Sequence, residues 1–201
     1  MDFTVYFITS RDFGRSHEEI AELALKAGVK TIQFRDKNMN GREMLRTAMK
    51  LKKWCDEFGA TFIVNDRIDV ALLCKADGVH VGQEDIPAHE ARRIFKGIVG
   101  VSVHNVEEAV EAEKYADYVG AGPVFATSTK KDARTPIGLK GLKEIVDAVS
   151  IPVVAIGSIN SKNISDVLEV RVDGFAVISA IAAAKEPAEA TKGLLDAIKN
   201  R

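Results

Sequence analysis

The sequence alternates along its whole length between short apolar runs and longer segments with helical apolar spacing. The apolar runs predict eight strands, at Thr4–Ile8, Thr31–Phe34, Thr61–Val64, Asp77–Val81, Ile98–Val101, Asp117–Val119, Ile151–Ala155 and Gly174–Ile178. The helical segments are Glu18–Ala27, Gly41–Phe58, Ile68–Cys74, Ala88–Phe95, Val106–Ala116, Leu139–Val149, Ile164–Val170 and one from Pro187 to about Ile198. Strands that alternate with helices predict a parallel sheet with helices on its faces.

Eight strand–helix units in a chain of 201 residues most simply close into a single (β/α)8 TIM barrel that spans residues 1–201. The alternative is an open, doubly wound sheet. The dinucleotide-binding form of that sheet needs a glycine-rich turn after its first strand, and the sequence has none there. Because the carboxyl ends of barrel strands carry the active site in this fold, the residues after each strand are the candidates for function.

Composition and charge narrow the class of protein further. The formal net charge is −1, which gives no reason to expect binding to nucleic acid or to an acidic membrane surface. No apolar run approaches the roughly 20 residues that span a bilayer, and the first residues lack the basic region of a secretory signal. Cys55 and Cys74 fit no zinc spacing, so they are predicted to be buried thiols in a reducing, cytoplasmic setting.

Charged residues follow the second, third and fourth predicted strands. Alternate positions after the second strand are occupied by Gln33, Arg35 and Lys37, so an extended backbone presents all three side chains on one side. The two cations there suit a diphosphate. A solvated charged turn is the alternative. Asp66 and Asp85 could share one Mg²⁺, an ion that takes one or two carboxylates together with phosphate oxygens and water. Each could instead be the N-cap of the helix that follows it, and both interpretations stay open.

Polar residues also follow the later strands. The stretch 120–132, after the sixth strand, suits a phosphate-rich anion or else is a solvated surface loop. Its polar side chains include Thr127, Ser128, Thr129, Lys130 and Lys131. Helices are expected to start at Gly157–Ser158 and Ile178–Ser179, and backbone N–H groups at these places are the usual phosphate site of such barrels. His104 invites a general-base interpretation, although a structural hydrogen bond is favoured.

Taken in order, these segments resemble the thiamine phosphate synthase family. The matching segments are Gln33–Lys37, Asn65–Arg67, His80–Asp85, Gly100–His104, Gly120–Asp132, Ile156–Ile159 and Val177–Ile181, which span nearly the whole chain. The resemblance implies a (β/α)8 barrel that joins 4-amino-2-methyl-5-hydroxymethylpyrimidine diphosphate to 4-methyl-5-(2-hydroxyethyl)thiazole phosphate, or to its carboxylated form. It implies thiamine phosphate and diphosphate as products, Mg²⁺ as cofactor and the two small molecules as partners, and it leaves room for a homo-oligomer.

The family's contacts carry over residue by residue. Those to the pyrimidine diphosphate fall on Gln33, Arg35, Lys37, Asn65, Ser102 and Lys130, and those to Mg²⁺ fall on Asp66 and Asp85. Those to the thiazole phosphate fall on Thr127, Thr129, Ser158, Ile178 and Ser179. The resemblance implies a Mg²⁺-assisted dissociative displacement in which the catalytic residues are Arg35, Lys37, Ser102 and Lys130. The family usually has two glycines where this chain has Gly157–Ser158, and Ser158 can still offer its backbone N–H if its φ is negative.

Other functions of the same barrel remain as alternatives. A sister family isomerises a thiazole phosphate and tends to carry a proton-transferring His where this chain has Pro123, and the acid pair would be idle there. A barrel that only binds thiazole phosphate would act as a regulator. A generic isomerase or aldolase would need a buried Lys or a Glu base at a strand end, and the sequence offers no convincing candidate.

Residues Thr127–Thr135 are expected to form a lid that excludes water.

Overall fold

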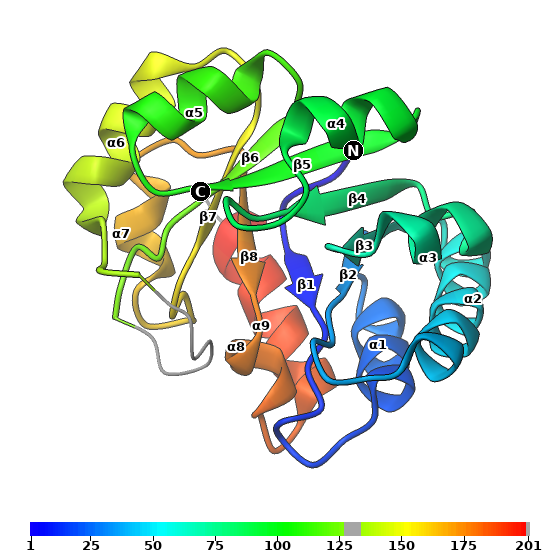
Figure 1. The fold of residues 1–201 in the computed structure, drawn as a ribbon. Coiled ribbons are helices and arrows are strands. Elements are labelled where there is room, and N and C mark those ends of the chain that lie inside the picture. Colours follow the sequence, from blue (N-terminus) through cyan, green and yellow to red (C-terminus); the bar gives the residue numbers. More distant parts are fainter. Residues whose placement is uncertain (127–133, 200–201) are drawn as a thin grey trace.

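Eight parallel strands close into a barrel, in chain order, in the computed structural model, which describes residues 1–126 and 134–199. The strands are β1 (Tyr6–Ile8), β2 (Thr31–Phe34), β3 (Thr61–Asn65), β4 (Gly78–Val81), β5 (Ile98–Val103), β6 (Tyr118–Ala121), β7 (Val153–Ile156) and β8 (Gly174–Val177). Because β1 pairs with both β2 and β8, the ring is closed (Figure 1). The predicted (β/α)8 barrel is confirmed, and the open-sheet alternative is wrong.

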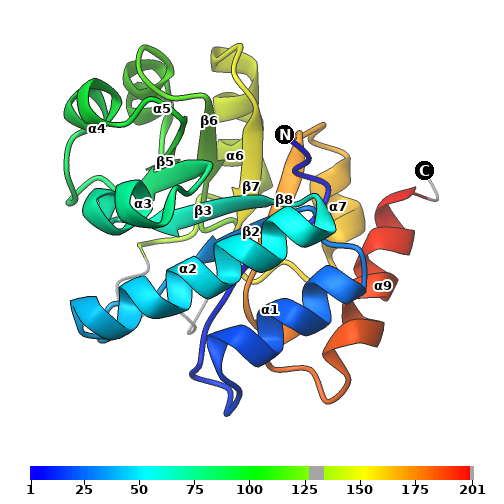
Figure 2. The same ribbon diagram turned by 90° about the vertical axis from the view of Figure 1, so that its right-hand side faces the viewer.

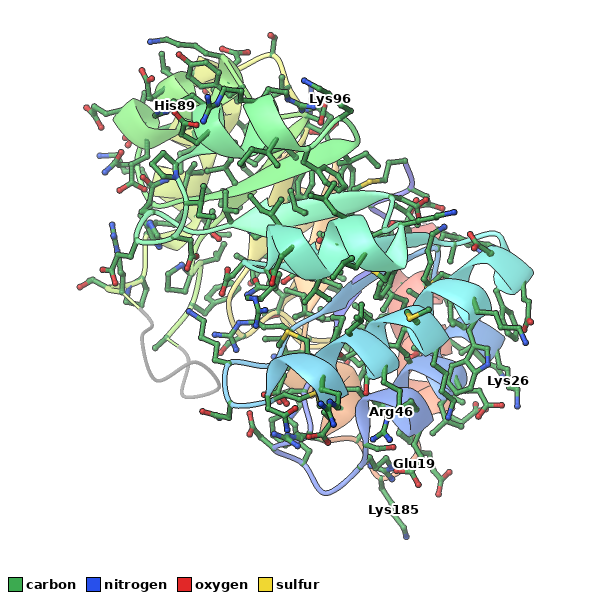
Figure 3. All side chains as sticks on the ribbon, turned by 45° about the vertical axis from the view of Figure 1, so that its right-hand side comes forward. Glu19, Lys26, Arg46, His89, Lys96 and Lys185 are labelled. Carbon is green, nitrogen blue, oxygen red and sulfur yellow. The ribbon has the colours of Figure 1, made fainter. Side chains whose placement is uncertain are left out.

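Helices cover the outside of this ring. In the described part of the chain they are α1 (His17–Lys26), α2 (Gly41–Phe58), α3 (Ile68–Cys74), α4 (Ala88–Ile94), α5 (Val106–Glu113), α6 (Gly138–Ala148), α7 (Ile164–Leu168), α8 (Ser179–Ala182) and α9 (Pro187–Lys199). Figure 2 shows α1 lying between α2 and α9 on one side of the barrel. Figure 3 shows Glu19, Lys26 and Arg46 pointing away from the barrel, as the amphipathic pattern requires.

Local capping explains where the first helices begin and end. Ser16 and Glu19 form a capping box, in which each side chain accepts the other residue's backbone N–H. Asn40 accepts the N–H of Glu43 to start α2, and Gly59 ends it in the left-handed region at φ +60°. Pro87 occupies the N-cap position of α4, which begins at Ala88 as predicted.

β5 and β6 each extend two residues further toward the barrel mouth than the apolar pattern predicts. β5 continues through Ser102 to Val103, and β6 continues to Ala121. The register pairs Ser102 with Gly120 and Val103 with Ala121. Because the ladder is made by backbone groups, a polar side chain does not end it. Ser102 is therefore held on a strand rather than on a loop.

Three aspartates fasten the amino end of the barrel. Asp77, Asp117 and Asp173 each directly precede an even-numbered strand, and each accepts a backbone N–H from the odd-numbered strand before it. The donors are Phe62, Val99 and Val153, at 2.8, 2.7 and 2.8 Å. Such charge-assisted bonds are stronger than neutral ones. They hold strands in register at the end of the barrel that faces away from the predicted site.

The hydrophobic core has two parts. The larger lies between the strands and the helices, and the smaller fills the inside of the barrel. The inner part consists of Phe3, Tyr6, Ile8, Ile63, Tyr118, Val154 and Ala176. Two of its largest members therefore carry hydroxyl groups, which need hydrogen-bond partners when buried.

The expectations drawn from composition can also be compared with the structure. Cys55 and Cys74 are buried free thiols, as predicted, and burial raises the pKa of Cys55 to about 12. Within residues 1–126 and 134–199, no helix has both the length and the apolar character that crossing a bilayer requires.

Candidate active site

A cavity of about 210 Å³ opens at the carboxyl ends of the strands. Of the predicted site residues it gathers Arg35, Lys37, Asn65, Asp66, Asp85, Ser102, Ser158, Ile178 and Ser179. Gln33, on β2, does not line it and is only 2% exposed. The predicted contacts at Thr127, Thr129 and Lys130, and most of the predicted lid, lie outside the described residues.

Arg35 and Lys37 flank a buried aspartate that shapes their turn. The Asp36 carboxylate, 4% exposed, accepts from Arg11 Nε at 2.7 Å, His17 Nε2 at 3.0 Å and the backbone N–H groups of Asn38 and Met39 at 2.8 and 2.9 Å. Burial raises the pKa of Asp36, but these hydrogen bonds outweigh burial and hold the pKa below its ordinary value. The two cations therefore reach the cavity from an anchored turn, not from a freely solvated one.

Asp66 and Asp85, which follow β3 and β4, meet at the cavity wall. Asp85 accepts the backbone N–H of Gly82 at 2.8 Å, and Lys37 Nζ lies 3.7 Å from Asp66 Oδ2. Burial raises the pKa of Asp66 to about 6, and the hydrogen-bonded carboxyl of Asp85 adds to the rise. The nearby cations Lys37 and Arg35 oppose it. Two carboxylates within hydrogen-bonding reach of each other repel when both are ionised. The pair therefore fits a divalent cation such as Mg²⁺.

Neither carboxylate caps a helix. The residues at the N-cap positions of α3 and α4 are Arg67 and Pro87, and neither helix has a side-chain cap. The N-cap interpretation of Asp66 and Asp85 is therefore wrong, because each helix starts after them. Among the residues that the structure describes, no group of three or more His, Cys, Asp or Glu side chains could hold a metal.

The side of the cavity formed after β7 is a tight turn. Gly157 has φ +113°, and a Cβ there would lie 2.6 Å from the Cα of Pro123, so the position requires glycine. Ser158 has φ +52°, so the condition under which its backbone N–H was expected to serve, a negative φ, is not met. The side-chain amides of Asn160 and Asn163 donate to the Ser158 carbonyl at 2.9 and 3.0 Å and hold it in this left-handed turn.

The polar groups on this side of the cavity are neutral. The Ser158 hydroxyl donates to the carbonyl of Ala126 at 2.7 Å, so it is already engaged by the chain. After β8, α8 begins at Ser179 with Ile178 at its N-cap position and no side-chain cap. Backbone N–H groups at such a start suit an anion. The cavity therefore offers a charged half after β2 to β4 and a neutral half after β7 and β8.

His104 lines the cavity but serves a structural hydrogen bond. Its Nδ1 lies 2.9 Å from Glu108 Oε2, and Arg134 Nη1 lies 3.0 Å from the other oxygen of the same carboxylate. The carboxylate thereby links β5 to the segment that re-enters the described chain at Arg134. The interpretation of His104 as a structural hydrogen-bonder is confirmed.

Sequence reasoning missed a chain of polar side chains inside the barrel. Its members, here called the buried chain, are Gln33, Tyr6, Tyr118, His80 and Ser102. Four of the five are 8% exposed or less, and Ser102 lies at the cavity wall. A partial signal was present, because strand alternation places Tyr6 and Tyr118 on the inward side of their strands. The pairing itself depends on which strands face each other across the barrel.

Comparisons with known proteins agree with the sequence-based resemblance. The family model described as "Thiamine monophosphate synthase" matches residues 5–181. A thiamine-phosphate synthase from Archaeoglobus fulgidus is 55% identical over 98% of this chain and 93% of its own length. Another from Pyrococcus horikoshii is 50% identical over 94% and 92%. The solved structure of a thiamine phosphate pyrophosphorylase from Pyrococcus furiosus is 46% identical, covers 98% of this chain and 96% of its own, and superposes with a TM-score of 0.93.

Proposed function

The chain belongs to the thiamine monophosphate synthase family, and we propose that it makes thiamine phosphate by Mg²⁺-assisted loss of diphosphate from hydroxymethylpyrimidine diphosphate. The proposed acceptor is hydroxyethylthiazole phosphate or its carboxylated form. The observation that carries the mechanism is the meeting of Asp66 and Asp85 beside Arg35 and Lys37 in one cavity. That arrangement suits a diphosphate with a divalent cation.

The charged half of the cavity is proposed to stabilise the leaving group. As the bond between the methylene carbon and the diphosphate oxygen breaks, negative charge grows on the diphosphate and positive charge on the aminopyrimidine. Arg35 and Lys37 would oppose the negative charge from a turn that Asp36 anchors, and charges held in place before the reaction are effective in electrostatic catalysis. Mg²⁺ bound to Asp66 and Asp85 would neutralise part of the same charge. The expected contribution of Lys130 stays a prediction, since that residue lies outside the described chain.

The neutral half is proposed to hold the thiazole phosphate. Backbone N–H groups at the start of α8, near Ser179, would bind the phosphate, and the Ser158 hydroxyl contributes to the turn through Ala126 instead. The thiazole nitrogen then attacks the methylene carbon. It has a free lone pair and needs correct placement, so no nucleophilic side chain or general base is required. The predicted contacts of Thr127 and Thr129 would complete this site.

Two alternatives make different demands on the cavity. A thiazole tautomerase needs a group that transfers protons, and Pro123 at the cavity wall cannot do so. A regulator that only binds thiazole phosphate would have no use for an acid pair beside two cations. The acid pair at Asp66 and Asp85 therefore favours the synthase over both.

The test is to mix the two substrates with the purified protein and to follow thiamine phosphate by mass spectrometry. We expect product only when Mg²⁺ is present, and loss of product with EDTA that excess Mg²⁺ restores. Product formed at the same rate in EDTA would overturn the metal role. Binding of thiazole phosphate without any product, with Mg²⁺ and both substrates present, would favour the regulator.

A further inference from the structure

A third cation, besides Arg35 and Lys37, lines the cavity. Arg134, which follows β6 and precedes α6, lines the cavity and has a side chain that is 43% exposed. It is not among the residues that the family resemblance assigns to a substrate. Its Nη1 donates to Glu108 Oε1 at 3.0 Å. A guanidinium has five N–H donors in a planar fork, so this bond leaves others for an anion in the cavity.

The Glu108 carboxylate, on α5, is held by other bonds besides the one from Arg134. Its second oxygen accepts the backbone N–H of His104 at 2.8 Å and lies 2.9 Å from His104 Nδ1. Burial raises the pKa of Glu108, but the hydrogen bonds from His104 outweigh burial and hold the pKa below its ordinary value. Because His104 directly follows β5, which ends at Val103, the Arg134 guanidinium is held beside the mouth end of β5.

The strand order places this cation between the two halves of the cavity. The ring runs in chain order, so β5 and β6 separate β2 to β4 from β7 and β8 on one side of the mouth. The charged half, which follows β2 to β4, is proposed to hold the diphosphate, and the neutral half, which follows β7 and β8, the thiazole phosphate. A guanidinium beside β5 therefore suits an anionic group at the junction where the two substrates meet.

The chemistry of the acceptor supplies such a group in one of its two forms. Both carbons that join the methyl and hydroxyethyl groups to the thiazole ring are occupied, so a carboxyl on the ring can only be on the carbon between nitrogen and sulfur. That nitrogen forms the bond to the methylene carbon of the pyrimidine, so the carboxylate would lie beside the forming bond. The planar fork of Arg matches a carboxylate through two parallel hydrogen bonds.

We infer that Arg134 is a specificity-determining residue that binds the carboxylate of the carboxylated thiazole phosphate, so that this acceptor is preferred to the plain one. The inference rests on the proposed function. Coupling is the same with both acceptors. The bond from the methylene carbon to oxygen breaks, its electron pair leaves with diphosphate, and the lone pair of the thiazole nitrogen forms the new bond to carbon. The carboxylate takes no part in this exchange, so Arg134 acts on recognition of the acceptor.

The experiment measures diphosphate released from hydroxymethylpyrimidine diphosphate with Mg²⁺ and either acceptor. One diphosphate leaves in each coupling, so the readout does not depend on the later fate of the carboxyl group. Arg134→Gln removes the charge and the fork, and Arg134→Lys keeps the charge alone. Arg93→Gln is the matched control, because Arg93 also pairs with a glutamate, Glu90, at 2.7 Å but does not line the cavity. The quantity compared is the ratio of kcat/KM for the carboxylated acceptor to kcat/KM for the plain one.

We expect the wild type and Arg93→Gln to prefer the carboxylated acceptor by about tenfold or more, which is what a hydrogen bond to a charged group supplies. Arg134→Gln should abolish this preference, and Arg134→Lys should keep only part of it. Partial unfolding lowers both rates together and cannot change the ratio. Arg134→Lys carries the test if circular dichroism shows that Arg134→Gln does not fold.

Three results would overturn the inference while the proposed function stands. The first is a ratio in the Arg134 variants equal to that of Arg93→Gln. The second is an equal rise of KM for both acceptors, which would assign Arg134 to the phosphate that they share. The third is a rise of KM for the pyrimidine diphosphate alone. Absence of diphosphate release by the wild type with either acceptor would instead remove the proposed function.

Discussion

Replacing Asp36 with Asn tests whether the anchored turn supports both the fold and the basic half of the site. The Asp36 side chain is 4% exposed and lies against Arg11 and His17. Asn keeps the size and can still accept the backbone N–H groups of Asn38 and Met39. Its amide nitrogen, however, would face the Arg11 and His17 nitrogens in place of a carboxylate oxygen. The substitution therefore leaves Arg11 Nε and His17 Nε2 without the carboxylate oxygen that accepts their hydrogen bonds.

The magnitude follows from that loss. Breaking a buried ion pair by removing one charge costs about 3–5 kcal/mol, because the remaining charge stays desolvated. Arg11 is 43% exposed and can turn toward water, so we expect a cost below that range, about 2–3 kcal/mol. At about 2–4 °C per kcal/mol for a chain of this size, Tm should fall by roughly 4–12 °C. Asp147→Asn removes an exposed helix pair with Lys143 and should cost less than about 1 kcal/mol.

The assays are urea unfolding for stability and steady-state kinetics for function. Since Arg35 and Lys37 flank Asp36, KM for the pyrimidine diphosphate should rise in Asp36→Asn at a temperature where the variant is folded. KM for thiazole phosphate should change little, because its proposed site follows β7 and β8. If Asp36→Asn were as stable as Asp147→Asn, or raised both KM values equally, the anchoring role would be refuted.

Three further predictions concern the acid pair, pH and the turn after β7. Asp66→Asn and Asp85→Asn should each lower turnover about a hundredfold or more, because each removes a proposed Mg²⁺ ligand. Stability in urea should not fall, because each substitution also removes one of two carboxylates that repel each other. Loss of stability in step with turnover would contradict the metal role. Burial holds the pKa of His17 below 6.5, so the unfolded chain binds the proton first, and the free energy of unfolding should fall as pH drops below about 6.5. Urea unfolding at pH 7.5 and 5.5 checks this. If the free energy of unfolding of His17→Gln fell by the same amount between these two pH values, the prediction would be refuted. Ser158→Ala should change KM for thiazole phosphate less than about tenfold, and a hundredfold rise would show that the hydroxyl binds phosphate.

The elements that sequence predicts best are those with local signals at both ends. The bounds of α2 match the prediction, because Asn40 caps its start, periodicity defines its apolar face and Gly59 stops it. The mouth ends of β5 and β6 were predicted too short. Ser102 and Gly120 look like loop residues in sequence, but their backbones are held in the ladder by the neighbouring strand. Strand length at the mouth is thus set by pairing between strands, which the local pattern does not contain.

Several predicted site residues lie together because each closely follows a barrel strand. Arg35, Asp66 and Ser158 reach one cavity because the barrel closes. What sequence could not supply was the state of each group. The raised pKa of Asp66 depends on burial and on Asp85, which comes from another strand. The positive φ of Ser158 depends on side-chain amides that grip its carbonyl. Both are tertiary effects, so neither leaves a local pattern.

The two ends of the barrel differ in how they treat carboxylates and backbone strain. At the amino end, Asp117 and Asp173 each accept a backbone N–H and hold two strands together. At the carboxyl end, the backbones of Asp66 and Ser158 have φ values of +60° and +52°. The Asp66 side chain also lies against the carboxyl of Asp85. Left-handed backbone in residues other than glycine and like charges in contact both raise the free energy of the folded state. Such features persist only where the surrounding structure fixes them, as the side-chain amides of Asn160 and Asn163 fix Ser158, so the mouth keeps an arrangement suited to a cation and a phosphate through its own local hydrogen bonds.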